Sequence, residues 1–236
     1  MKVTAVYGNM RRGSTRHCVE NFLKAMEKYT DVCVKEYSLP KDMPHFCLGC
    51  FGCFIKGEQT CPHYESAGAM AKSIEETDLI ILASPVYVYD VSGQMKAFLD
   101  HMAYRWMSHR PHPSMFGKTA VVISVTAGAG LSPCVKTMER SLRFWGVRKI
   151  FTFKKRVAAM AWEDVRGEKQ ERVEKELTLL ARKVFNSMQK GNGRRIPLFI
   201  RFFFCLMRKM QEGQTYNKLE YDYWDKQGWF SGKKPF

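Results

Sequence analysis

Short apolar runs alternate with amphipathic segments through the first 190 residues of the chain. Runs rich in Val, Ile and aromatic residues predict five strands, at 3–7, 32–39, 78–83, 119–125 and 146–153. Between and after these runs, apolar residues recur at helical spacing and predict helices at 14–28, 67–76, 92–104, 132–144 and 173–188. Strands and helices therefore follow one another in regular alternation.

This alternation predicts an α/β fold with an open five-stranded parallel sheet and helices on both faces. The runs at 79–83 and 119–125 are continuously apolar, which is typical of strands that helices cover on both sides. Right-handed crossovers place each connecting helix against the sheet. One domain is therefore expected over residues 1–190, with a ligand crevice outside the carboxyl ends of its strands.

Residues 191–236 begin with a glycine-rich break and form a C-terminal extension. Segment 194–210 is apolar and basic, and segment 216–236 holds five Tyr or Trp residues and two Phe residues. About 40 residues are too few to bury a core of their own. We therefore expect the extension to pack on the first domain or on a neighbouring subunit.

Three loops at the expected ligand edge have the composition of a site for a phosphorylated planar molecule. The first, 8–16, brings cations and the hydroxyls of Ser14 and Thr15 to a helix N-terminus, where free N–H groups favour phosphate. The third, 84–92, places two tyrosines after a buried strand. The fourth, 126–130, consists of small residues that let backbone amides approach a flat ligand closely.

The second loop, 45–63, is expected at the same edge of the sheet as the other three. It holds four cysteines with the spacing C-x2-C-x2-C-x7-C, at Cys47, Cys50, Cys53 and Cys61. Four thiolates at such spacing can hold a 4Fe-4S cluster. Two alternatives stay open, which are a zinc site made by these cysteines or by three of them with His45 or His63, and a loop without metal. The other four cysteines lie in predicted helices or strands, where small buried side chains are common.

The motifs GNMRRGST (8–15), SPVYVYDVSGQMKAFLDH (84–101) and TAGAG (126–130) give the chain a resemblance to the flavodoxin-like NAD(P)H-dependent FMN reductases over roughly residues 1–185. Its cysteine spacing resembles that of the iron-sulfur flavoprotein branch, although His63-Tyr64-Glu65 stands where relatives often have paired acids. The resemblance implies a flavodoxin-like fold, FMN, and NAD(P)H as co-substrate.

The resemblance also assigns residues to these groups. It places FMN against three segments of the ligand edge, at Asn9, Arg11, Gly13, Ser14 and Thr15, at Ser84, Pro85, Val86, Tyr87, Val88 and Tyr89, and at Thr126, Ala127, Gly128 and Gly130. It places the 4Fe-4S cluster on Cys47, Cys50, Cys53 and Cys61. The implied function is an FMN-dependent NAD(P)H oxidoreductase that passes electrons between FMN and the cluster in a homodimer or homotetramer. A cluster-free NAD(P)H:FMN or quinone reductase is the alternative.

Charge raises a further alternative. The chain has 38 Lys and Arg against 23 Asp and Glu, a net charge of +15, and residues 148–236 hold 21 of these cations and 10 of the acids. A basic binding module for nucleic acid or anionic membrane would have this balance, but alternating acids and bases on solvated helices explain it as well, and we expect no nucleic-acid partner.

The sequence offers no Ser-His-Asp, HExxH or paired-carboxylate pattern of a hydrolase. No signal-like or membrane-spanning stretch is evident, which predicts a cytoplasmic protein with reduced cysteines.

Overall fold

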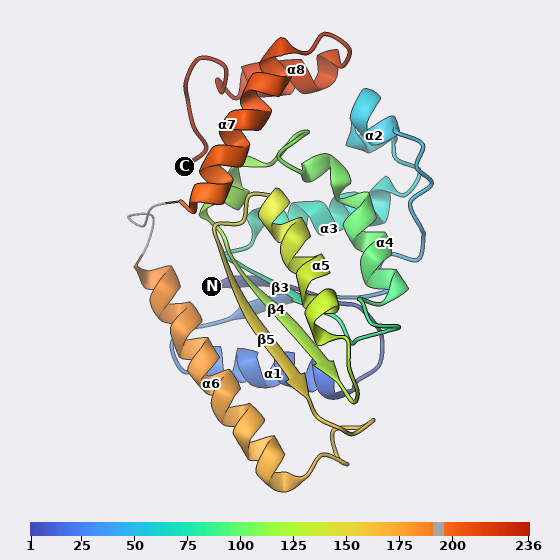
Figure 1. Cartoon of the computed structure of the whole chain (residues 1–236), viewed down its shortest axis with the longest axis vertical. Coiled ribbons are helices and arrows are strands. Elements are labelled where there is room, and N and C mark those ends of the chain that lie inside the picture. The colour runs from blue at the N-terminus through green and yellow to red at the C-terminus, as the bar shows by residue number, and fades with distance from the viewer. Residues whose placement is uncertain (191–195) are drawn as a thin grey trace.

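The computed structural model describes residues 1–190 and 196–236, and the break predicted at 191–193 lies outside these residues. A parallel five-stranded sheet with the order β2-β1-β3-β4-β5 forms its centre (Figure 1). The strands are β1 Lys2–Tyr7, β2 Cys33–Ser38, β3 Leu79–Ala83, β4 Thr119–Thr126 and β5 Lys149–Arg156. The strand prediction and the α/β fold class are therefore confirmed.

Helices cover both faces of the sheet. One face carries α1 Ser14–Met26 and α6 Gly167–Gln189, and the other carries α3 Tyr64–Glu76, α4 Gly93–His101 and α5 Leu131–Phe144. Short helical turns, which are α2 Gly52–Ile55, η1 Glu58–Thr60, η2 Ala103–Arg105 and η3 Pro113–Gly117, lie in the connections. The helix predicted at 92–104 is shorter because Ser92 caps it, accepting a bond from the Met95 N–H at 3.2 Å, and the chain turns after His101.

The pleat of the central strands explains the two cores. Ile80 and Leu82 pack with α3, α4 and α5, whereas Leu79, Ile81 and Ala83 pack with α1 and α6. Successive side chains of a strand point to opposite faces, so a continuously apolar strand supplies both cores at once. These buried strands hold the loops at their carboxyl ends in fixed positions.

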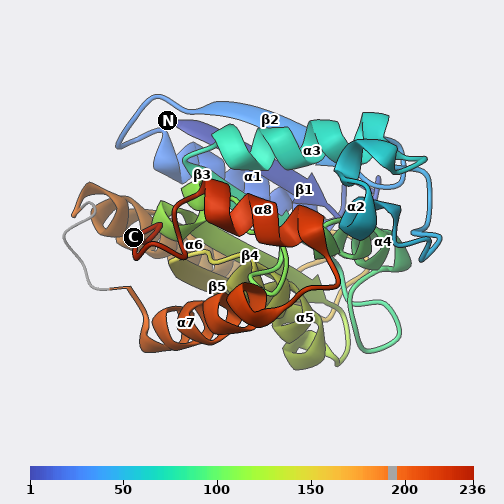
Figure 2. The same ribbon diagram turned by 90° about the horizontal axis from the view of Figure 1, so that it is seen from above.

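Two further helices, α7 Leu198–Gly213 and α8 Lys218–Lys226, follow the sheet domain (Figures 1 and 2). Ile200, Phe204 and Trp224 from these helices are buried together with Met107 and Phe116, which precede β4. The opposite side of α7 leaves several large apolar side chains exposed, which are Leu198, Phe199, Phe202, Leu206 and Met210. Among the described residues, no helix has the length and apolar character needed to cross a membrane.

Candidate functional site

The N-terminus of α1 forms the floor of one pocket. Gly13 occupies the N-cap position without a side chain that could bond the helix, and the first intrahelical bond runs from the His17 N–H to the Gly13 carbonyl at 3.1 Å. The earlier N–H groups of a helix have no partner within it. The Ser14 hydroxyl is also buried and makes no hydrogen bond. This helix end therefore presents several donors whose bonds the protein itself does not satisfy.

A cation stands above this helix end. The Arg11 guanidinium donates to the Met160 carbonyl at 2.8 Å. Met160 belongs to the segment that follows β5, so this bond ties Arg11 to that segment at the wall of the pocket. The Asn9 amide donates to the Tyr87 hydroxyl at 3.2 Å and links the first loop to the third. Positive charge and N–H groups converge on one point, which is the arrangement that binds a phosphate.

The first and third loops are joined where β1 and β3 lie side by side. The Ser92 hydroxyl donates to the Gly8 carbonyl, and the Ser92 N–H donates to the Ser84 hydroxyl at 3.1 Å. A Cβ on residue 8 would lie 2.8 Å from both serine oxygens, so this close approach requires glycine. In the order β2-β1-β3-β4-β5, the point between β1 and β3 is where the strand order reverses, and ligands of open α/β sheets bind at that point.

The third loop ends in a strained turn. Tyr87 and Asp90 exchange backbone bonds of 2.8 and 3.0 Å, and the two residues between them have positive φ, 47° at Val88 and 65° at Tyr89. Positive φ is rare for a β-branched residue and costs free energy. The turn leaves the Val88 side chain 97% exposed and the Tyr89 side chain 68% exposed. Strain of this kind is concentrated at functional sites.

The fourth loop packs against this turn. Gly130 begins α5 with φ at +91°, and a Cβ there would lie 2.7 Å from Tyr89 Cα. The loop is braced internally by the Gly128 N–H, which donates to the Thr126 hydroxyl at 3.2 Å. Loops three and four therefore form one wall.

These loops enclose a cavity of about 230 Å³. The structure brings ten of the predicted cofactor residues to its surface, which are Asn9, Arg11, Gly13, Ser14, Thr15, Pro85, Val86, Tyr87, Thr126 and Ala127. Five others do not line it, which are the buried Ser84, the outward-pointing Val88 and Tyr89, and Gly128 and Gly130. The segment after β5 adds Val157, Ala159 and Met160, which sequence reasoning missed because no motif marks them.

The four cysteines of the second loop line a different cavity, of about 250 Å³. Cys47 and Cys50 are exposed, whereas Cys53 and Cys61 are half-buried. Burial, together with the nearby thiols of the other three cysteines, raises the pKa of the Cys53 thiol to about 11. The thiols are thus close enough for their charges to interact, and a cation that neutralised several thiolates would relieve this repulsion.

This second cavity does not adjoin the first, and the two share no lining residue. Helix α4 separates them, since its cap Ser92 touches Gly8 and its last residue, His101, lines the cysteine cavity. Nine helical residues span about 13 Å. Our expectation that the cysteine loop lies at the same edge as the other three therefore needs correction, because segment 39–63 runs from β2 out to α2 beside α3 and α4 (Figure 1).

The segment between η2 and η3 and the C-terminal extension both support the cysteine loop. The buried Arg110 guanidinium donates to the carbonyls of Cys53 and Phe54 and pairs with Glu58 at 3.0 Å. The Asn217 amide, from the residue that caps α8, donates to the same Phe54 carbonyl at 3.1 Å. In Figures 1 and 2 α8 lies beside α2. No residue after Met160 lines the first cavity, so within the described residues of one chain the extension contacts the cysteine loop and not the phosphate site.

A buried network ties α8 to the sheet domain at the same place. Glu220 accepts a bond from the His109 ring at 2.8 Å and another from the Gln211 amide at 3.0 Å. The Trp224 indole N–H donates to the His109 carbonyl. No pattern in the sequence marks these partners, because more than 100 residues separate His109 from α8.

Two histidines of the cysteine cavity, His63 and His101, lie close to Cys61, and a third, His45, packs on His63. His63 stacks on His45 with ring centroids 4.5 Å apart, and its Nδ1 lies 2.9 Å from Nε2 of His101. Partial burial, together with the His45 and His101 rings, lowers the pKa of His63 and favours the neutral imidazole. Sequence reasoning considered His45 and His63 here but missed His101, which comes from α4.

A parallel sheet of this strand order, with a helix N-terminus, a cation and the aromatic side chain of Tyr87 around a cavity at its switch point, defines a flavodoxin-like protein with a cavity suited to a phosphorylated planar cofactor. Comparison with known sequences gives the family. The pattern of the NADPH-dependent FMN reductases matches residues 1–159, and the chain belongs to this family.

Individual relatives agree with this assignment. The chain is 32% identical to an iron-sulfur flavoprotein of Archaeoglobus fulgidus over 149 aligned residues. The aligned region covers 62% of this chain and 64% of the relative's own length. Among solved structures, an NADH:FMN oxidoreductase aligns with a TM-score of 0.55 at 17% identity, over 78% of this chain and 89% of its own. An FMN-dependent NADH-azoreductase from Bacillus anthracis in complex with FMN aligns with a TM-score of 0.56 at 11% identity, over 77% of this chain and 100% of its own. At these identities the two solved structures support the fold alone.

Proposed function

We propose that the protein is an FMN-dependent NAD(P)H oxidoreductase. The observation that carries this proposal is the Ser14 hydroxyl, a buried donor without a partner that lines the first cavity at the N-terminus of α1. Burying an unpaired polar group costs about 1–3 kcal/mol. A ligand phosphate in the cavity would remove this cost, and family membership identifies FMN as that ligand.

Different residues of the cavity would contact the phosphate and the ring system of FMN. Ser14, Thr15 and the free N–H groups of α1 would bond the phosphate, and Arg11 would offset its charge. Pro85, Val86 and Tyr87 would face the flat ring system, together with Thr126 and Ala127 from the neighbouring loop of the same wall. When bound, FMN supplies the redox chemistry, taking hydride from NAD(P)H and passing electrons on singly or in pairs. The protein itself needs no acid or base for that step.

Reconstitution of the apoprotein tests this proposal. FMN and riboflavin differ only in the phosphate, so we expect FMN to bind with one site per chain and riboflavin to bind far more weakly. NADH or NADPH should then bleach the flavin absorbance under anaerobic conditions. Equal affinity for the two flavins would contradict the phosphate site, and failure of both nucleotides to reduce bound FMN would contradict the activity.

We further propose that Cys47, Cys50, Cys53 and Cys61 hold a 4Fe-4S cluster that exchanges electrons with FMN. All four side chains line one cavity, and four thiolates are the ligand set of such a cluster. Similarity to an iron-sulfur flavoprotein adds support. A cluster-free NAD(P)H:FMN or quinone reductase is the competing function, and it would use the first cavity alone.

Iron and acid-labile sulfide analysis distinguishes the two functions. Anaerobically purified protein should contain about four of each per chain. The Cys50→Ser variant should lose both, and Cys33→Ser is the matched control because Cys33 is exposed on β2 and does not line the cavity. Iron retained by Cys50→Ser would refute the ligand assignment.

The assembly and location remain proposals of the same kind. We propose a homo-oligomer, a dimer or tetramer, in the cytoplasm. Within one chain the two cavities lie at opposite ends of α4, so a neighbouring copy could bring a cysteine cavity close to an FMN site. Light scattering of the FMN-loaded protein should give a multiple of 27.4 kDa, and a monomer mass would overturn the proposal.

A further inference from the structure

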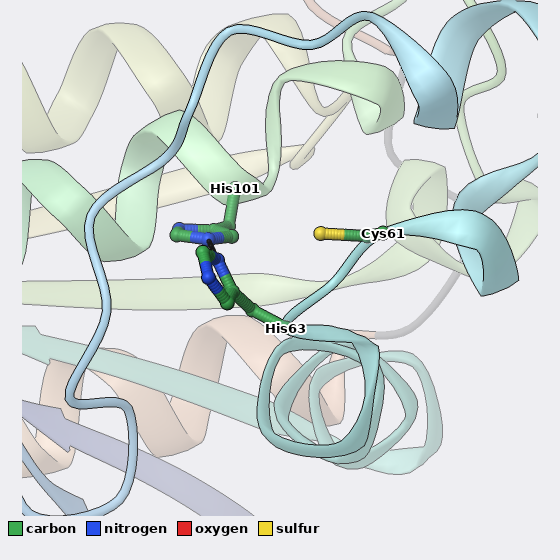
Figure 3. A group of neighbouring side chains, drawn as sticks. All are labelled: Cys61, His63 and His101. Atoms are coloured by element: carbon green, nitrogen blue, oxygen red, sulfur yellow. Dashed lines mark hydrogen bonds between the residues drawn. The ribbon is translucent and has the colours of Figure 1, made fainter.

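Cys61, His63 and His101 converge on one point at the wall of the cysteine cavity (Figure 3). The thiol sulfur and the two ring nitrogens all lie within 4.8 Å of one another. In residues 1–190 and 196–236, no other group of three Cys, His, Asp or Glu side chains comes as close. His101 is buried, Cys61 and His63 are half-buried, and the point they face is open to the cavity.

Hydrogen bonds hold His101 in the orientation of a metal ligand. Its Nδ1 lies 2.8 Å from the Ala97 carbonyl, which can only accept, so Nδ1 carries the proton and Nε2 keeps its lone pair. A histidine that binds metal through one ring nitrogen usually donates a hydrogen bond from the other nitrogen to a carbonyl or carboxylate, as His101 does here. Nε2 is the nitrogen that faces His63.

His63 is held in place as well. Its ring is stacked on that of His45 with an interplanar angle of 15°. Because Nε2 of His101 accepts, Nδ1 of His63 donates across the 2.9 Å between them. A metal ion at this point would require the His63 proton to move from Nδ1 to Nε2 and the Cys61 thiol to release its proton to solvent.

The spacing suits zinc better than it suits an iron-sulfur cluster. With Zn–S near 2.3 Å and Zn–N near 2.0–2.1 Å, tetrahedral ligand atoms lie about 3.3–3.8 Å apart, so the three groups need to move by less than about 1 Å. The other cysteines are absent from this close group, although they line the same cavity. Cysteine thiolate and histidine imidazole are both zinc ligands, and three protein ligands with a water molecule in the fourth position make a four-coordinate Zn²⁺ site.

We propose that Cys61, His63 and His101 form a Zn²⁺ site that is filled when no cluster occupies Cys61. Because both sites need the Cys61 thiolate, a chain can hold either zinc or a four-cysteine cluster, and not both. The inference goes beyond the proposed oxidoreductase function and does not depend on it. The fourth coordination position of the zinc site faces the cavity and can take a water molecule.

Cobalt is the probe for this site, because Co²⁺ takes tetrahedral zinc sites and absorbs visible light. Iron-free protein, prepared anaerobically and loaded with FMN, should bind one Co²⁺ per chain and release it to one equivalent of Zn²⁺. His63→Gln should weaken binding by more than the roughly 10–100-fold that loss of an outer partner costs. His63 is half-exposed and accessible to substitution, and His101→Gln is the second variant for the same outcome.

Cys50→Ser is the matched control, because Cys50 lies in the same cavity but outside the close group. It should keep the Co²⁺ affinity and spectrum of the parent protein while losing the cluster. A Co²⁺ spectrum of a four-sulfur site, abolished by Cys50→Ser and kept by His63→Gln, would overturn the proposal, and so would the absence of stoichiometric binding. Loss of iron from Cys50→Ser tests the cluster separately.

Discussion

The Ser14→Ala substitution separates the role of this hydroxyl in folding from its role in binding. Ser14 is the first residue of α1, its side chain is buried, and its hydroxyl has no partner in the protein. Alanine keeps the helix and removes only the unpaired oxygen. The apoprotein should therefore unfold at a higher denaturant concentration, with a gain of about 1–3 kcal/mol.

FMN binding should respond in the opposite direction. A hydrogen bond to a charged group contributes about 1.5–3 kcal/mol, and a tenfold change in affinity corresponds to about 1.4 kcal/mol. Ser14→Ala should thus raise the Kd for FMN by about 10–150-fold. The Kd for riboflavin should not change, because riboflavin has no phosphate for the hydroxyl to bond.

Flavin fluorescence titration and urea unfolding of the apoprotein measure the two effects. Ser141→Ala is the control, because Ser141 is equally buried in a helix but its hydroxyl bonds the Thr137 carbonyl at 3.5 Å. That variant should lose about 1 kcal/mol of stability and keep its FMN affinity. If Ser14→Ala destabilised the apoprotein or left the Kd for FMN unchanged, the phosphate cradle would be wrong.

Three further predictions concern the walls and supports of the sites. Gly130→Ala should lower the free energy of unfolding, measured in urea, by about 1–3 kcal/mol, because residue 130 has a positive φ and its added Cβ would collide with Tyr89. Gly128→Ala should lower it by less than about 1 kcal/mol, because a Cβ at residue 128 meets open space. Trp224→Ala should lower the free energy of unfolding by about 3–5 kcal/mol, since this fully buried side chain fills the core beneath α8. Burial lowers the pKa of His112 to about 4, so the unfolded chain takes up a proton at higher pH than the folded one. Stability should therefore fall as pH drops from about 6.5 toward 4, and His112→Gln should flatten that slope in denaturation curves.

The sheet could be predicted because its strands leave a strong pattern. The runs at 79–83 and 119–125 are apolar on both faces, and their burial between two helical layers leaves little choice of position. The end of α4 could not be predicted, because the apolar pattern continues past His101 while the chain turns into η2. A local pattern cannot report a turn that depends on packing against other elements.

For the candidate sites too, residues marked by a local sequence pattern could be predicted, whereas features set by contacts between distant elements could not. Ser14 and Thr15 could be assigned because a helix start after a strand is visible in the sequence. The positive φ of Val88 and Tyr89 could not be predicted, since neither residue type favours it. The turn is closed by the backbone bonds between Tyr87 and Asp90 and packs against Gly130. Partners such as His101 and Arg110 reach the cysteine loop from distant parts of the chain, and one sequence carries no sign of such contacts.

An anaerobic reductive titration, with FMN and iron measured on the same sample, tests the central proposal most directly. If each chain holds FMN and a one-electron cluster on its four cysteines, reduction takes up about three electrons per chain. About two electrons per chain, in protein that holds one FMN and whose four loop thiols react with a thiol reagent, would contradict the account and leave a flavin reductase without a cluster.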